Sequence, residues 1–270
     1  PVFYVPDKLA LGLKTLLEYH EWRDNRLANG FGVSADMNES QAAQLKQVKE
    51  LNRATLTEFE SKQLISAWDV PTTKESIAAT ADEAAEIAAD IGFPVAIKID
   101  SPDILHKTEA GAIKLGINDK ETAKTAFNEV WQNAKQYNPN AQINGALVQE
   151  MVSGGTEFIV GVSYDSQLGP IILFGTGGVM VEVYNDVALR QCPITTTEAR
   201  EMISQVKGSK LLSGFRGSPK GDIDALVSTL VSVSNLAVHL DGELSELDIN
   251  PLMVLSDGNG VKAADALAAF

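Results

Sequence analysis

The sequence predicts a mixed fold of helices and strands, in an α/β or α+β arrangement. Segments whose apolar residues recur about every 3.6 positions, as in amphipathic helices, occur along most of the chain. Short runs rich in Val, Ile and Leu, typical of strands, lie between them. Two such runs, TEFIVGVSYD and PIILFGTG, are joined by SQLG, a spacing suited to an antiparallel hairpin. Together these observations exclude an all-helical or an all-strand protein.

The helical pattern predicts segments in chain order that end at loops, at Pro71 or at Gly92. They cover residues 8–29, 38–54, 56–71, 82–90, 119–137 and, as two helices, 195–239. Asp119 is a favourable cap because its side-chain oxygen can accept hydrogen bonds from the first amides of the helix. Residues 28–55 have the least core-like composition, which makes them the candidate linker.

The strand pattern predicts a short strand at the very start and several more beyond residue 90. These runs cover residues 94–99, 112–117, 143–151, 156–165, 170–177, 179–186 and 188–193. The chain closes with ELSELDINPLMVL, the turn SDGNG and VKAADALAAF. The last two strands can pair as a hairpin through that turn.

Composition and charge exclude several classes of partner. The chain has 22 Lys and Arg against 36 Asp and Glu, a net charge of -14. Nucleic acids and anionic membranes need a basic surface, so we expect neither as a partner. The single Cys192 excludes an intramolecular disulfide and a cysteine zinc site. No apolar run reaches membrane-spanning length, so we expect a cytoplasmic protein. The start at Pro1 suggests a fragment or subunit of a larger protein.

His106 and Lys98 are the first candidate functional residues. His106 is one of three histidines and lies in the polar loop SPDILHKTEAG, between the apolar runs FPVAIKI and AIKLGI. The loop is either a solvated turn or a place where the imidazole does chemistry. Lys98 lies inside the first of those runs. A buried ammonium needs an anionic partner, so Lys98 either faces solvent from an edge strand or contacts a phosphate.

A glycine-rich stretch and a strand end could hold a nucleotide, although the common phosphate motifs are missing. There is no P-loop sequence, and GTGGVM lacks the third Gly of a dinucleotide fingerprint. GTGG, residues 175–178, is either a tight turn or a loop whose amides approach an anion. Gln149 to Met151 end a strand and could form a hinge whose backbone pairs with a flat ring.

ELDINP and the later VKAADA suggest a cation site. Asp248 and Asn250 alternate along one strand and so share a face. The hairpin through SDGNG would bring Asp265 to the same end. Two carboxylates and an amide oxygen suit Mg²⁺, which prefers oxygen ligands and substrate phosphates. The alternative is that Asp248 and Asn250 only cap the turn into Pro251.

These motifs resemble one known family in their order along the chain. GFPVAIKI with SPDILHK, GTEFIVGV, FGTGGVMVEV followed by ND, LLSGFRG and ELDINPL resemble the ATP-grasp domain of NDP-forming acyl-CoA synthetases. These include ADP-forming acetyl-CoA synthetases, and they are relatives of succinyl-CoA synthetase. The resemblance covers roughly residues 56–269 and implies a two-lobed ATP-grasp fold with a hinge near Gln149.

The start of the chain fits the same family. PVFYVPDKLALGLKTLL resembles the tail of the family's CoA-ligase region. We therefore expect residues 1–50 to be a helical tail or linker from an upstream CoA-ligase region. Residues 51–270 would form the ATP-grasp domain, with one lobe over 51–148 and the other over 149–270.

The resemblance also implies an activity, acid + CoA + ATP ⇌ acyl-CoA + ADP + phosphate. It implies ATP/ADP and Mg²⁺ as cofactors, and a CoA-binding part, fused upstream or separate, that binds CoA and a small carboxylic acid. It further implies an oligomer in the full enzyme. His106 would be a phosphoryl carrier, a covalent role that histidine can fill.

The remaining roles follow by the same matching. Lys98 would contact the nucleotide phosphates, and Asn250 and Asp265 would hold Mg²⁺ with Asp248 close by. Contacts to the base, the ribose and the phosphate groups would come from Glu150, Met151, Glu157, Gly175, Gly177, Gly178, Arg190 and Arg216.

Two departures and two alternatives accompany the resemblance. The family usually has two glycines where this chain has Gly111-Ala112, and many members have Arg where Leu267 stands. The same domain also occurs as a regulatory, non-catalytic module of protein lysine acetyltransferases. A ligase that makes an acyl phosphate directly is the other alternative, but it has no use for His106.

Overall fold

The computed structural model describes residues 5–29, 36–177, 186–214, 217–240 and 242–270. By its internal contacts the chain divides into two units, Pro1–Asp36 and Met37–Phe270. Helix α1 (Pro6–Asn29) belongs to the first unit, and the strand expected at the start falls outside the described residues. Among the helices that the structure describes, none is long and apolar enough to cross a membrane.

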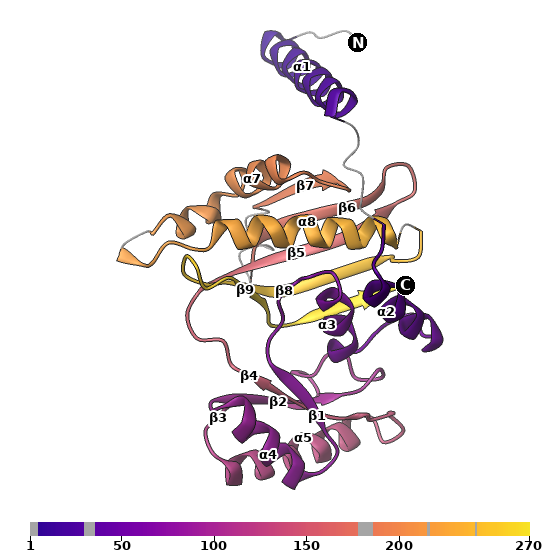
Figure 1. The fold of residues 1–270 in the computed structure, drawn as a ribbon, viewed down its shortest axis with the longest axis vertical. Coiled ribbons are helices and arrows are strands. Elements are labelled where there is room, and N and C mark those ends of the chain that lie inside the picture. The colour runs from indigo at the N-terminus through magenta and orange to yellow at the C-terminus, as the bar shows by residue number, and fades with distance from the viewer. Residues whose placement is uncertain (1–4, 30–35, 178–185, 215–216, 241) are drawn as a thin grey trace. The chain divides into compact units, whose positions relative to one another are not determined.

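The second unit contains a small antiparallel sheet covered by two helices. Its strands are β1 (Glu75–Ala78), β2 (Val95–Asp100), β3 (Ile113–Ile117) and β4 (Gly145–Glu150), in the order β1-β4-β2-β3. Helices α4 (Ala81–Ile91) and α5 (Lys120–Tyr137) pack on one face (Figure 1), where Val95 and Ile97 join their core. Because side chains alternate along a strand, Lys98 lies on the opposite face.

The large sheet has the order β10-β8-β5-β6-β7, with β9 beside β8. The strands are β5 (Thr156–Asp165), β6 (Gly169–Thr176), β7 (Val187–Gln191), β8 (Glu246–Val254), β9 (Val261–Ala263) and β10 (Ala266–Ala269). Helices α7 (Thr196–Gln205) and α8 (Ile223–His239) pack on one face and, with the 3-10 helix η1 (Lys207–Ser213), enclose the main core (Figure 1). The other face carries Asp248, Gly161, Leu173 and Leu189 in one cross-strand row.

Two further helices, α2 (Glu39–Glu50) and α3 (Glu58–Ser66), precede the small sheet. Both begin with a capping box, formed by Asn38 and by Thr57, which satisfies free amides of the first turn. Leu45 and Val48 of α2 are buried in the main core, so the candidate linker at 28–55 contains a packed helix. The sequence predicts a helix over 38–54 but does not indicate its packing, because Leu45 and Val48 are the two buried residues of a largely exposed, polar helix.

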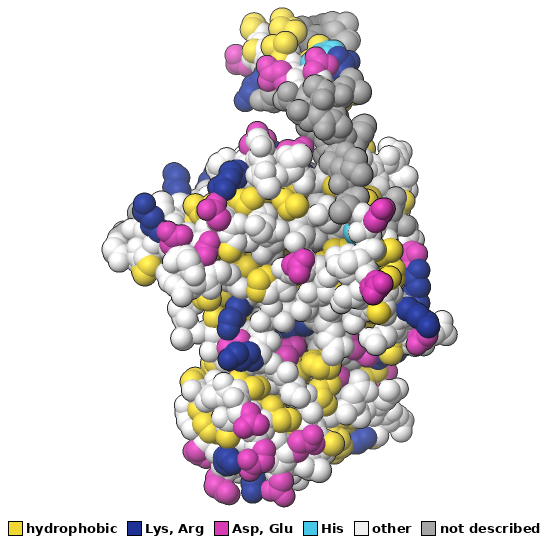
Figure 2. Space-filling model, viewed as in Figure 1, with side chains coloured by type: hydrophobic (Ala, Val, Ile, Leu, Met, Phe, Trp, Pro, Cys, Tyr) yellow, Lys and Arg dark blue, Asp and Glu magenta, His cyan; other side chains and the backbone are white. Residues whose placement is uncertain are grey.

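The expected fold class is confirmed: helices and strands mix, and two sheets form the second unit. Strand β1 and the 3-10 helix η1 were not anticipated, since each is short and carries little periodic signal. The strand expected at 179–186 falls almost entirely on residues outside those described. On the surface in Figure 2, acidic side chains gather over α4 and α5, in agreement with the net charge of -14.

Candidate functional site

His106 is presented on an exposed turn between β2 and β3 whose two ends are buried. Ile104 and Ala110 belong to a small separate core with residues of β2 and α5. The Ala110 amide donates to the His106 carbonyl at 3.2 Å, and the Ala112 amide donates to the Lys107 carbonyl at 2.8 Å. The ends of the turn are therefore fixed by packing, while the imidazole is exposed.

Two cavities of about 220 Å³ each adjoin His106. Both are lined by Leu105, His106, Lys107 and Asp265. The first also contains Thr57, Glu58, Ser101, Asp248, Asn250, Ala266 and Leu267, and the second Lys98, Thr108, Glu109 and Ile113. Five residues singled out in the sequence thus come together here, from β2, β8, the His106 turn and the segment between β9 and β10.

Glu58, at the start of α3, is the electrostatic centre of this region. Its Oε1 accepts from Lys98 Nζ at 2.7 Å and lies 2.9 Å from Lys62 Nζ, while its Oε2 accepts from Lys107 Nζ at 2.9 Å. Burial alone would raise the pKa of Glu58, but the three lysines outweigh burial and hold it well below its usual range. Burial lowers the pKa of Lys107, but the charge of Glu58 raises it by more, so the net change is an increase. Lys107 and Glu58 therefore both stay charged.

Asp248, Asn250 and Asp265 form an acidic wall of the first cavity. Asp248 lies opposite Leu267 of β10, and the Asn250 amide donates to the Asp265 carbonyl at 3.2 Å. Burial, with Glu246 and Asp265 nearby, raises the pKa of Asp248 to about 6. Burial and the charge of Glu58 raise the pKa of Asp265 as well. Two half-buried carboxylates whose pKa values are raised in this way would be stabilised in their ionised form by a cation.

The acidic wall would not by itself complete a metal site. Within the described part of the chain, no three His, Cys, Asp or Glu side chains are grouped so that they could hold a metal ion. The donor set consists of two carboxylates and the Asn250 amide oxygen. Its chemistry fits Mg²⁺, because that ion is commonly held by one or two carboxylates together with substrate phosphates and water.

Glu157 lies near the start of β5, and Glu150 is the last residue of β4. Register places Glu157 and Lys262 both opposite Met253, and Lys262 Nζ donates to Glu150 Oε1 at 2.6 Å. Glu157 is four residues from Gly161, which pairs with Asp248, so it lies about 13 Å from the acidic wall along the strand. The two expected base and ribose contacts therefore share one end of the open face.

Glu150 and Met151 were expected to offer backbone groups to the base, and the amides of both already have partners. The Glu150 amide donates to the Lys74 carbonyl at 2.9 Å, and the Met151 amide donates to the Pro94 carbonyl at 3.3 Å. A base at this position would have to use their carbonyl oxygens.

The glycines of GTGG have a packing role in the structure. A Cβ on Gly175 would come within 2.8 Å of Val187, and one on Gly177 within 3.2 Å of the Glu157 backbone. Close approach of neighbouring strands is therefore sufficient to explain both. Gly178 and Arg216 lie outside the described residues.

Arg190 is not brought to the site. Register places it in one row with Ile172, Val162 and Leu247, which are buried on the helix-covered face. Its guanidinium donates to the Leu189 carbonyl at 2.8 Å and lies 3.9 Å from Glu201 of α7. Asp248 faces the opposite side of the same sheet. The expected phosphate contact fails because strand register places Arg190 and Asp248 on opposite faces of the sheet. The sequence alone did not give that register.

Glu58, Lys62 and Lys107 were missed by sequence reasoning. Glu58 and Lys62 are four residues apart on one helix, a spacing that usually marks an exposed surface pair. Here both side chains are 1% exposed. Lys107 follows His106 directly, and that adjacency was the one available signal for it.

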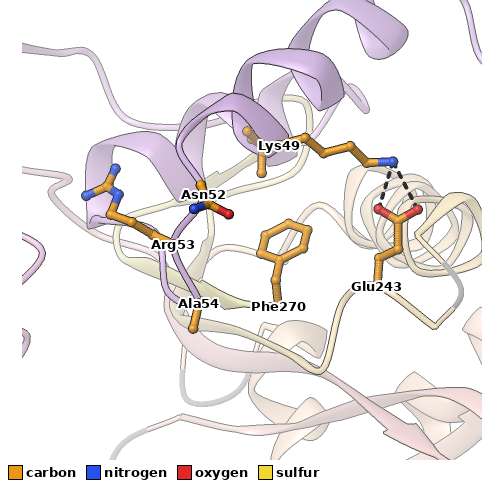
Figure 3. Close-up of a pocket in the computed structure, with 7 residues that line it drawn as sticks. Lys49, Asn52, Arg53, Ala54, Glu243 and Phe270 are labelled. Atoms are coloured by element: carbon orange, nitrogen blue, oxygen red, sulfur yellow. Dashed lines mark hydrogen bonds and ion pairs between the residues drawn. The ribbon is translucent and has the colours of Figure 1, made fainter.

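A larger cavity, about 350 Å³, is lined by a different set of residues (Figure 3). It is lined by Val48, Lys49, Asn52, Arg53, Ala54, Glu243 and Phe270, and Figure 3 shows Lys49 reaching across to Glu243 beside the Phe270 ring. None of its lining residues belongs to the set described above. The larger cavity therefore contains none of the residues that the sequence singled out.

Comparison with known proteins decides the family. The family profile described as an ATP-grasp domain matches residues 47–268. The chain belongs to the ATP-grasp family. The resemblance inferred from the motifs is confirmed, including its acyl-CoA synthetase branch, by the relatives that follow.

The relatives are ADP-forming acid–CoA ligases. The chain is 40% identical over 222 residues to acetate–CoA ligase [ADP-forming] II subunit beta of Pyrococcus furiosus, covering 82% of this chain and 94% of that protein. It is 36% identical over 254 residues to 4-hydroxybutyrate–CoA ligase [ADP-forming] of Nitrosopumilus maritimus, covering 94% of this chain and 36% of that protein. The chain thus spans nearly the full length of the Pyrococcus furiosus protein and about a third of the Nitrosopumilus maritimus protein.

A solved relative has the same fold. It is acetyl-coenzyme A synthetase 1 of Ca. Korarchaeum cryptofilum, described in complex with coenzyme A and Mg-AMPPCP, with its phosphohistidine segment pointing towards the nucleotide-binding site. Its TM-score is 0.74 at 35% identity, covering 85% of this chain and 99% of that one. That all three relatives are ligases or synthetases does not favour the acetyltransferase-associated alternative.

Proposed function

We propose that this chain is the nucleotide-binding, phosphoryl-transferring part of an ADP-forming acyl-CoA synthetase. The reaction of the whole enzyme would be acid + CoA + ATP ⇌ acyl-CoA + ADP + phosphate. A CoA-binding and CoA-ligase part, in the same polypeptide or in a partner subunit, would bind the small carboxylic acid and CoA. The full enzyme would be an oligomer in the cytoplasm, and residues 1–50 would connect to that upstream part.

The observation that carries the proposal is the position of His106. Its imidazole is exposed on a turn with buried ends and lines two cavities, together with Lys107 and Asp265. A histidine that only caps a surface turn does not need basic and acidic side chains arranged around it. A group that receives and passes on a phosphoryl group needs both.

Phosphoryl transfer to His106 is a displacement at the γ-phosphorus of ATP. A neutral imidazole nitrogen attacks, the phosphorus–nitrogen bond forms, and the bond from the γ-phosphorus to the bridging oxygen breaks. ADP leaves with the electron pair of that bond. Lys98 and Lys107 would stabilise the negative charge on the phosphoryl oxygens, and Asp248, Asn250 and Asp265 would supply oxygen ligands to Mg²⁺. Mg²⁺, when bound, neutralises charge on the phosphate oxygens.

Labelling with [γ-³²P]ATP and Mg²⁺ tests the proposal. The chain with its CoA-ligase part should acquire label that is labile to acid and stable to alkali, as expected of phosphohistidine. His106→Asn should abolish that label, because an amide nitrogen is not a nucleophile. His20→Asn, in α1, is the matched control and should keep it. Undiminished label in His106→Asn would refute the carrier role.

A further inference from the structure

Glu58 joins three parts of the site through a single carboxylate. It lies in the first turn of α3 and is 1% exposed. Its Oε1 accepts from Lys98 of β2, and its Oε2 accepts from Lys107 of the His106 turn. The two oxygens of Glu58 thus connect the helix, the strand that carries Lys98 and the turn that carries His106.

Two lysines share the Glu58 carboxylate as their hydrogen-bonded anion, while Asp265 and Asp100 attract Lys107 without a hydrogen bond. Lys62, the third partner of Glu58, has a second carboxylate of its own, since its Nζ donates to Glu75 Oε2 at 2.6 Å. Lys98 and Lys107 line the cavities beside His106 and share Glu58. Glu58 therefore holds their ammonium groups in place without fully neutralising them. Both ammonium groups lie beside a cavity, where an incoming phosphoryl group could contact them.

Stability alone does not explain such a cluster. Replacing buried ion pairs by apolar groups is often neutral or stabilising, because desolvation offsets the attraction between the charges. What the cluster does provide is geometry. Ile104 and Ala110 fix the ends of the His106 turn by packing. Lys107 ties the middle of the turn to α3, at the position next to the imidazole.

We propose that Glu58 is a positioning residue for phosphoryl transfer between the nucleotide and His106. It holds Lys107, and with it the His106 turn, at a fixed place beside Lys98. Glu58 forms no bond to phosphorus and takes no proton. This inference rests on the function proposed above, and it adds a residue that orients the nucleophile and its two neighbouring cations.

The first test is the rate of His106 phosphorylation in a single turnover at saturating Mg-ATP, with the CoA-ligase part present. Lys107→Met and Glu58→Gln should each slow the step by about 10- to 100-fold, because a small displacement of a nucleophile is costly. Lys107→Arg should stay within a few-fold of the unaltered protein, since its cation can still reach Glu58 Oε2. Saturating nucleotide removes any effect on affinity from the comparison.

Lys114→Met is the matched control. Lys114 lies on β3, is 41% exposed, and pairs with Glu129, outside both cavities. The change removes the same charge from a neighbouring strand. The phosphorylation rate should therefore stay within about two-fold of the unaltered protein, since isolated surface pairs contribute little.

The second test is hydrogen–deuterium exchange of the peptide that spans residues 101–112. Glu58→Gln and Lys107→Met should speed exchange there and leave peptides from β8 unchanged. A merely structural role would instead raise exchange in β8 and α8 as well. If Glu58→Gln does not fold, Lys107→Met removes the same link to the turn while leaving Glu58 paired with Lys98 and Lys62.

The outcomes separate this inference from the function on which it rests. Label on His106 in the unaltered enzyme, with rate and local exchange unchanged in Lys107→Met, would overturn the role of Glu58 alone. No label on His106 in the unaltered enzyme would overturn the proposed function, and the positioning role with it. A slowed rate with local loosening, rescued by Lys107→Arg, is the expected result.

Discussion

Lys98 and Arg190 are both strand cations that the sequence assigned to phosphate binding, but they occupy different environments. Lys98 lines a cavity beside His106, whereas Arg190 lies on the helix-covered face of the large sheet near Glu201. We expect Lys98→Met to weaken Mg-ADP binding by about 10- to 100-fold, the loss of one charge-assisted contact. Arg190→Met should stay within about two-fold. Calorimetric titration of both variants measures this. Equal losses in both would contradict the placement of Arg190.

At the same scale, sequence reasoning found the chemically distinctive residues and missed their partners. Asp248, Asn250 and Asp265 stood out because their types and spacing suit a cation, whereas the role of His106 came from the family resemblance; the structure brings all four together. Glu58 did not stand out, because an acidic residue at a helix start is common on protein surfaces. Its burial depends on lysines 40 and 49 positions away along the chain, and no local pattern reports that.

At the scale of elements, α3 connects the two sheets. Ser61 Oγ accepts from the Ala268 amide of β10 at 3.0 Å and donates to the Thr57 carbonyl at 2.7 Å, while Lys62 reaches Glu75 of β1. Ser61→Ala would leave a buried amide of β10 without its partner. We expect a loss of about 1–3 kcal/mol in the free energy of unfolding, measured by denaturant titration.

Ser228→Ala is the control for that loss. Ser228 is exposed on α8, and its hydroxyl donates to the Asp224 carbonyl at 3.1 Å within the same helix. Its removal should change the free energy of unfolding by less than about 0.5 kcal/mol. A loss in Ser61→Ala no greater than in Ser228→Ala would mean that α3 does not depend on this link to β10.

The elements themselves were largely readable from periodicity, and the exceptions have physical causes. Helices α4 and α5 and strands β2, β3 and β5 follow the expected segments to within a few residues, because their apolar patterns are strong. Strand β1, with the sequence ESIA, is too short to show alternation and is stabilised by pairing with β4. Helix α2 was expected within 38–54, but its packing was not, because only Leu45 and Val48 of it are buried and composition suggested a linker.

At the scale of the second unit, polar contacts join the small sheet to the strands of the large one. Gln149 Nε2 donates to the Ala264 carbonyl at 2.6 Å, and Lys262 Nζ donates to Glu150 Oε1 at 2.6 Å. Lys98 lies on the small sheet and Asp248 on the large one, each beside a cavity that His106 also lines. A nucleotide that contacts both would link the two sheets, and its binding energy would appear as stability of the whole unit.

That linkage predicts a nucleotide-dependent rise in the melting temperature, and the acidic wall makes the rise depend on Mg²⁺. Nucleotide at 100 times its Kd should add about 2.7 kcal/mol, which raises Tm by roughly 5–10 °C for a unit of this size. Asp265→Asn should remove most of the Mg²⁺-dependent part, because a neutral amide cannot balance the cation's charge. Thermal melts with ADP, with Mg²⁺ or a chelator, measure this. An equal shift in the chelator would place the phosphates away from Asp248 and Asp265, and would separate nucleotide binding from the cation site.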